Sequence, residues 1–183
     1  MALIKDTKGR GEEETDSGYE RVLGNRQLGM LISKVHATSI RQGTELESFL
    51  AVRLKKTDEI SIHNINKEKR VFKDIKHGHD IVIDCVIEKN GKIMLIEIKD
   101  GDTFDTKKVA GEVESLLTAK EHLIKHNKLK EQDVSVHYCS FNATSHEQIE
   151  RGAKGLLPKG SAMTGKEFCK LVGLDFDKIV QER

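Results

Sequence analysis

Two carboxylates and one ammonium group lie inside the most hydrophobic stretch of the chain. Residues 83–101 read IDCVIEKNGKIMLIEIKDG and place Asp84, Glu97 and Lys99 among isoleucine, valine and leucine. Paired carboxylates completed by waters are ligands that Mg²⁺ accepts. The chemistry depends on whether the fold brings these side chains together.

A two-residue turn at Asn90-Gly91 is the strongest local signal for a hairpin in this stretch, because both turn residues adopt positive φ. Centring the turn there places Asp84 opposite Glu97, and Val82 opposite Lys99. The two carboxylates are then cross-strand neighbours, roughly 5 Å apart at Cβ. Directly opposed like charges are destabilising, and burying them unpaired costs several kcal/mol more.

The fold must therefore offset this charge. A shared proton is one solution, and a divalent cation is the better one. Asp80 lies on the same face but too far along to face Glu97, so it is a reserve ligand. The alternative is an exposed edge hairpin with surface charges, but this would also expose Val86 and Leu95. The opposite face is wholly apolar and is expected to pack under helices: Ile83, Cys85, Ile87, Met94, Ile96 and Ile98.

The elements around the hairpin follow from periodicity and capping signals. Residues 1–17 are polar and without period, which predicts a flexible arm, and residues 18–183 are expected to form one domain. A second helix is expected to open at Thr44, through the capping-box pattern Thr44-Glu45-Leu46-Glu47. The remaining expected helices are 18–36, 105–126, 146–153, 164–172 and 174–181, and the expected strands are 60–65, 71–75 and 134–141. This order predicts an α/β domain with a mixed central sheet flanked by helices.

The pattern Asp84, twelve residues, Glu97-Ile98-Lys99 across a hairpin resembles the PD-(D/E)XK nuclease superfamily. The resemblance covers about residues 40–142 and implies that family's restriction-endonuclease-like αβββαβ core. Glu47 matches the glutamate that the family carries on the preceding helix. Ile83 stands where the proline of the family name would be. The stretches KVHATSIRQGTELE, IEIKDGDTFDTKK and TGKEFCKLVGL look most like type II restriction endonucleases.

The resemblance implies Mg²⁺-dependent hydrolysis of phosphodiester bonds in double-stranded DNA. Asp84 and Glu97 would hold Mg²⁺, for which Mn²⁺ would substitute, together with the Ile98 carbonyl. Lys99 would position or help deprotonate the attacking water, and Glu47 would bind a second metal or orient a water. A homodimer on a palindromic site, accompanied by a DNA methyltransferase for that site, is implied as well. Two alternatives stay open: a structure-selective nuclease such as a junction resolvase, and a non-catalytic DNA-binding module of the same fold.

Composition limits which partners and which compartment can be predicted. Among 183 residues, 31 Lys and Arg nearly balance 30 Asp and Glu, so net charge does not by itself indicate a nucleic-acid partner. The three cysteines have no paired spacing, which favours a reducing compartment. No apolar run reaches the roughly 18 residues that a membrane span needs, and a cytoplasmic protein is expected. Lys107 and Lys108 are candidate DNA phosphate contacts, or otherwise an exposed helical face. Glu112 and Glu114 are expected to be surface charges, although one of them could face the site.

Overall fold

The computed structural model describes residues 18–54, 58–62, 71–73, 78–101 and 104–182. In chain order the elements are α2 (Gly18–Leu23), α3 (Arg26–Leu54), β1 (Ile60–Ile62), β2 (Val71–Lys73), β3 (Asp80–Val82), β4 (Cys85–Lys89), β5 (Lys92–Lys99), α4 (Thr106–Asn127), the 3₁₀ helix η2 (Glu131–Asp133), β6 (Val134–Ser140), α5 (His146–Gly152), β7 (Ala162–Thr164), α6 (Gly165–Val172) and α7 (Phe176–Glu182). None of the helices in these ranges is long and apolar enough to cross a membrane. The chain divides into two compact units, Met1–Leu46 and Glu47–Arg183. The assignment of 18–183 to one nuclease-like domain stays a prediction.

Helix α3 runs without interruption through the point where a second helix was expected to begin. Asn25 caps its start, because the Asn25 Oδ1 accepts the N–H of Leu28 at 3.0 Å. The expectation of a new helix at Thr44 is wrong, because the preceding turn already supplies carbonyl acceptors for the N–H groups there. Arg41 and Glu45 form an ion pair of 2.9 Å across that turn. A glycine inside a helix costs only about 1 kcal/mol relative to alanine, so Gly43 does not end it.

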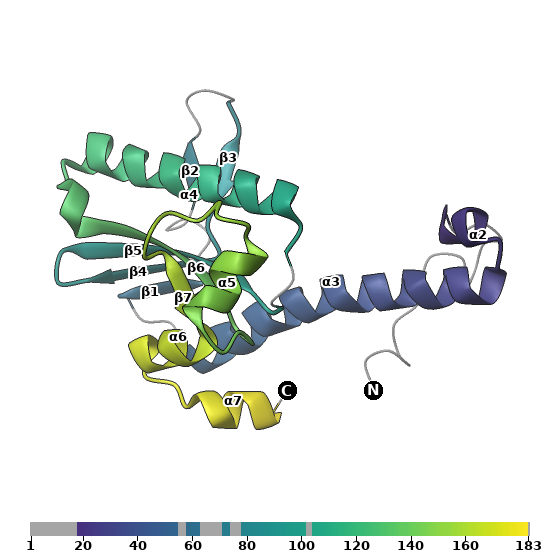
Figure 1. The fold of residues 1–183 in the computed structure, drawn as a ribbon. Coiled ribbons are helices and arrows are strands. Elements are labelled where there is room, and N and C mark those ends of the chain that lie inside the picture. The colour runs from purple at the N-terminus through teal and green to yellow at the C-terminus, as the bar shows by residue number, and fades with distance from the viewer. Residues whose placement is uncertain (1–17, 55–57, 63–70, 74–77, 102–103, 183) are drawn as a thin grey trace. The chain divides into compact units, whose positions relative to one another are not determined.

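A five-stranded mixed sheet forms the centre of the second unit. Its strand order is β1-β4-β5-β6-β7. The first two pairings, β1 with β4 and β4 with β5, are antiparallel, whereas β5 with β6 and β6 with β7 are parallel. Read along the chain, α3, β1, β4, β5, α4 and β6 give the predicted αβββαβ order, with α4 on one face of the sheet (Figure 1). The expected α/β fold with a mixed central sheet is confirmed.

The turn between β4 and β5 is the predicted one. Asn90 and Gly91 have φ of 53° and 73°, the left-handed values that a two-residue hairpin turn demands. The predicted register is also confirmed, since Lys89 pairs with Lys92 and Val86 pairs with Leu95. The pairing continues to Cys85 and Ile96, where β4 begins.

The strand before β4 departs from the expected hairpin. Val82 was expected opposite Lys99, but it belongs to β3 and pairs with Val71 of β2 in a separate two-stranded sheet. The chain bends at Ile83 and Asp84, so the side-chain alternation shifts by one residue there. Of the expected strands 60–65 and 71–75, the parts 63–65 and 74–75 lie outside the described residues.

The bend decides which face each aliphatic residue covers. Ile83 was expected on the face opposite Val86 and Leu95, but all three pack in one cluster against α4. The other members of this cluster are Phe72, Ile81, Leu116, Ala119, Leu123 and Val134. Cys85 does lie on the opposite face and is buried, with its thiol near Cys139 of β6, which in turn lies near Cys169 of α6. Both faces of the central strands are therefore covered.

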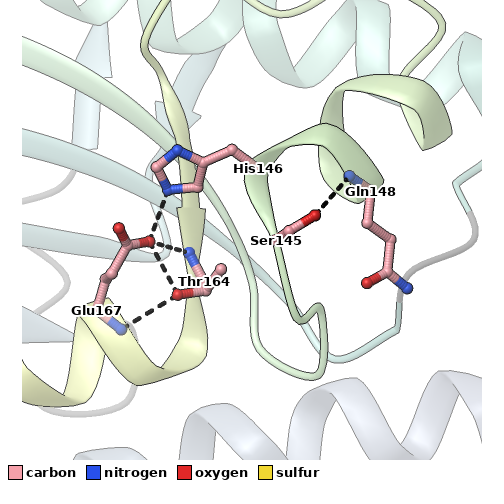
Figure 2. A network of polar contacts seen from close by, with 5 residues as sticks. All are labelled: Ser145, His146, Gln148, Thr164 and Glu167. Atoms are coloured by element: carbon pink, nitrogen blue, oxygen red, sulfur yellow. Dashed lines mark hydrogen bonds and ion pairs between the residues drawn. The ribbon is translucent and has the colours of Figure 1, made fainter.

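The C-terminal segment adds a strand that periodicity did not predict. Ala162–Thr164 is too short to show alternation, yet it pairs in parallel with β6 as strand β7. Thr164 then caps α6 in a capping box with Glu167. The same Glu167 carboxylate lies 2.7 Å from the His146 Nε2, so the starts of α5 and α6 are joined (Figure 2). Ser145 caps α5 by accepting the N–H of Gln148 at 3.3 Å.

Gly165 at the start of α6 predicts a specific stability effect. A Cβ at this position would lie 2.9 Å from the Phe141 carbonyl carbon and in closer contact with its oxygen, and this backbone cannot yield as a side chain could. Gly165→Ala is therefore expected to lower the free energy of unfolding by about 1–3 kcal/mol in urea denaturation.

Gly111→Ala is the matched control, because Gly111 lies in α4 and a Cβ there meets no atom within 4 Å. It should raise the free energy of unfolding by about 0.5–1 kcal/mol. Equal effects of the two substitutions would contradict the steric explanation.

Candidate functional site

Strand β5 delivers two of the predicted site residues to its carboxyl end. Glu97 is buried, at 9% exposure, and Lys99 closes the strand two residues later on the same face. The backbone here is held by the loop after β6. The Phe141 N–H donates to the Lys99 carbonyl at 2.7 Å, and the Asn142 side-chain amide donates to the Asp100 carbonyl at 2.7 Å. The carboxyl ends of the parallel strands β5 and β6 therefore form one fixed edge.

Asp84 reaches this edge from the bend before β4. Its Oδ2 accepts the backbone N–H of Ile98 at 2.9 Å. Ile98 lies two residues beyond Ile96, where the pairing of β5 with β4 ends. The side chain thus replaces a ladder acceptor that the bend removes. This bond fixes the Asp84 carboxylate beside the residue that follows Glu97.

Lys99 connects two carboxylates from different elements. Its Nζ lies 2.6 Å from the Glu97 Oε1 and 2.9 Å from the Glu112 Oε1, so the strand and helix α4 meet at one ammonium group. The other oxygen of Glu112, Oε2, accepts a hydrogen bond of 2.9 Å from the hydroxyl of Tyr138. Tyr138 is buried on β6, where it pairs in register with Glu97.

Burial and crowded charge shift the acid–base behaviour of these groups. Burial raises the pKa of Glu97 to about 8, and the charge of Asp84 adds to the rise while Lys99 opposes it. Burial lowers the pKa of Lys99, but the charge of Glu97 and the hydrogen bond to Glu112 outweigh burial and hold it above its usual range. The pKa of Tyr138 is held well above its usual range by burial and by the charge of Glu112.

The other candidate residues lie on three other elements, α3, β3 and α4. Glu47 is half-buried on α3, and it is the first residue of the second unit. Asp80 is exposed and opens β3, in the two-stranded sheet rather than the sheet that carries Glu97. Lys107 and Lys108 are exposed in the first turn of α4. The roles predicted for these residues stay predictions.

Glu112 was expected to be a surface charge, with the alternative that it or Glu114 could face the site, and Tyr138 was not predicted as a site residue. Glu112 follows Val109 by three residues and precedes Leu116 by four, and both of these are buried. Positions three and four apart share a helix face, so an acid between two core positions was the available signal. No such signal marks Tyr138, because its proximity to Glu97 arises from pairing between β5 and β6.

The arrangement has the donor atoms that a hard cation uses. Asp84 and Glu97 offer carboxylate oxygens, and Mg²⁺ is commonly bound by one or two carboxylates with waters and substrate phosphates completing its shell. Within the described ranges, no three or more His, Cys, Asp or Glu side chains are grouped so that they alone could hold a metal. Any cation held by this pair would therefore rely on backbone, solvent or substrate oxygens as well.

Fold and site together define a class: an α/β protein of restriction-endonuclease-like architecture, with acids and a lysine at the end of its central strand. No family model matches the sequence. The sequence is, however, 32% identical to the type II restriction enzyme HhaII of Haemophilus parahaemolyticus over 205 aligned residues. This alignment covers 99% of the present chain and 87% of HhaII. The chain belongs to the type II restriction enzyme family.

The raised pKa of Glu97 predicts how the stability of the metal-free protein depends on pH. The pKa of Glu97 is about 8 in the folded protein, against 4.5 for a solvated glutamate. Between these values the folded state binds more protons than the unfolded state, so the free energy of unfolding falls as pH rises from about 4.5 to about 8. Glu97→Gln should flatten this decline, as measured by urea denaturation in EDTA at several pH values.

Glu88→Gln is the control, because Glu88 is an exposed acid on the adjacent strand β4. It should keep the wild-type decline. If the stability of Glu97→Gln declines as steeply with pH as that of the wild type, the raised pKa of Glu97 is contradicted.

Proposed function

We propose that this protein is a Mg²⁺-dependent endonuclease that hydrolyses phosphodiester bonds of double-stranded DNA at a short specific site. The observation that carries the proposal is the 32% identity to a type II restriction enzyme across 99% of the chain. The cluster of Asp84, Glu97 and Lys99 at the edge of the mixed sheet is consistent with it. These residues also match the PD-(D/E)XK pattern, to which we assign the site.

Charge balance favours a cation at this edge. Asp84, Glu97 and Glu112 bring three carboxyl groups near the single ammonium group of Lys99. Burial raises the pKa of Glu97, and the charges of Asp84 and Glu112 add to the rise although Lys99 opposes it. A divalent cation beside Asp84 and Glu97 would supply the missing positive charge, so the residues fit Mg²⁺ or Mn²⁺.

Each site residue then has a role in hydrolysis. A bound Mg²⁺ would polarise the scissile phosphate and lower the pKa of a water. Asp84, Glu97 and the Ile98 carbonyl would hold it, while Lys99 would orient the attacking water and offset phosphate charge. Glu47 is proposed to bind a second metal or to orient a water.

The DNA-binding and assembly proposals follow from the family. Lys107 and Lys108 are exposed where α4 begins, soon after β5 ends, and are proposed to contact DNA phosphates. Cutting both strands with one site per chain implies a homodimer, whose two-fold axis would match a palindromic target. A DNA methyltransferase acting on the same site is the proposed companion.

A plasmid digest tests the proposed function directly. Purified protein with Mg²⁺ is expected to give discrete DNA fragments, and EDTA should abolish them. Cleavage confined to branched DNA would instead identify a structure-selective nuclease. Binding without cleavage, at any Mg²⁺ or Mn²⁺ concentration, would identify a non-catalytic DNA-binding module.

Lys99→Ala and Glu97→Ala are expected to lower the rate of DNA cleavage by about 10²-fold or more, because each removes a group that acts on the reacting water or its cation. Initial rates on plasmid DNA in Mg²⁺ measure the loss. Lys92→Ala is the matched control, since Lys92 is an exposed lysine on the same strand, and it should cleave at the wild-type rate. Wild-type rates in Lys99→Ala or Glu97→Ala would refute the assigned site.

Asp84→Asn separates the structural role of Asp84 from its charge. The asparagine carbonyl can still accept the Ile98 N–H, so the melting temperature should stay close to that of the wild type while cleavage is lost. Asp84→Ala removes the acceptor as well, and it should lower the free energy of unfolding by about 1–3 kcal/mol. If Asp84→Asn cleaves DNA normally, Asp84 holds no cation, and Asp80 becomes the candidate.

A further inference from the structure

Lys99 has two carboxylate partners, and only one of them is assigned to the cation. Its Nζ contacts the Glu97 Oε1 at 2.6 Å and the Glu112 Oε1 at 2.9 Å. Under the proposed function, a divalent cation held by Glu97 would compete with Lys99 for this carboxylate and would repel the ammonium group. Lys99 would then lose its shorter contact at the moment when its position matters. A second anion that does not ligate the cation would keep it in place.

The contacts of Glu112 suit it to be that anion. Its Oε2 is fixed by the Tyr138 hydroxyl at 2.9 Å, which leaves Oε1 directed at Lys99. The donor itself cannot shift easily, because Tyr138 is buried at 1% exposure and lies edge-on to Phe104, with ring centroids 5.4 Å apart. The Glu112 carboxylate is therefore held from the core side by a group that does not contact solvent.

We propose that Glu112, held by the Tyr138 hydroxyl, is a positioning residue that keeps the Lys99 ammonium group in place when Glu97 binds the cation. This role rests on the proposed function and extends it to two residues outside the PD-(D/E)XK pattern. Glu112 acts through Lys99 and touches neither the cation nor the DNA. Tyr138 acts one step further away, through Glu112.

Kinetics of single variants give the first test. Glu112→Gln keeps the shape and the Tyr138 contact but removes the charge, so kcat should fall by about 10- to 100-fold, as for other supporting partners of a metal site. KM for DNA and the melting temperature should stay near the wild-type values. Tyr138→Phe should lower kcat in the same direction but less. Glu114→Gln is the control, because Glu114 is an exposed acid on the same helix, and it should not change kcat.

A double-mutant cycle tests whether Glu112 acts through Lys99. In a Lys99→Met background no ammonium group is left to position, so adding Glu112→Gln should change the residual kcat by less than about threefold. The full 10- to 100-fold loss in both backgrounds would show that Glu112 acts by another route, such as direct cation binding. A fall in melting temperature that accounts for the lost activity would also overturn the proposal.

The NMR signal of the Lys99 ammonium group gives a readout that does not depend on DNA cleavage. A hydrogen-bonded ammonium group exchanges its protons slowly enough to be observed. In the wild type this signal should persist when Mg²⁺ is added, and in Glu112→Gln Mg²⁺ should abolish it. If Mg²⁺ leaves the Glu112→Gln signal intact, the positioning role is wrong. Failure of the wild type to cleave any DNA would instead overturn the proposed function.

Discussion

The contact of one lysine ammonium group with two carboxylates is the interaction on which this site depends. Lys99 lies 2.6 Å from Glu97 and 2.9 Å from Glu112, and it joins the central strand to the helix that covers it. A buried carboxylate without a partner costs several kcal/mol, so the contact with the lysine stabilises Glu97 at this edge, while Glu112 is held by Tyr138 as well. Asp84 brings a further carboxyl group to this edge, and its charge adds to the rise in the pKa of Glu97 that burial causes.

The surrounding fold buries this charge cluster and fixes its backbone. Strand β5 is covered on both faces, so Glu97 is desolvated, while the loop after β6 fixes the backbone at Lys99. The bend at Asp84 interrupts the strand and frees its carboxylate to bind the Ile98 N–H. A continuous hairpin would have kept Asp84 in the alternation of the sheet. The irregularity in the strand thus serves the site.

Identity to HhaII along nearly the whole chain places the protein in the type II restriction enzyme family. The αβββαβ order of the elements agrees with the fold expected from the Asp84 and Glu97-Ile98-Lys99 pattern. Glu112 and Tyr138 lie outside that pattern, yet they contact its lysine directly or through one bond. The pattern alone therefore does not name every side chain that contacts this lysine directly or through one hydrogen bond.

Local sequence determined the elements whose signals are local. Asn90-Gly91 set the hairpin register because both residues readily adopt the positive φ that a two-residue hairpin turn requires. Asp105 and the apolar stripe after it defined α4. The pattern Thr-x-x-Glu shows where local signals stop: it caps α6 at Thr164, but at Thr44 it lies inside α3, because the helix already arrives from upstream. The bend at Ile83, strand β7, and the meeting of Glu112 and Tyr138 with Lys99 were decided only by tertiary structure. Each of these depends on pairing or packing between segments distant in the chain, which no local period records.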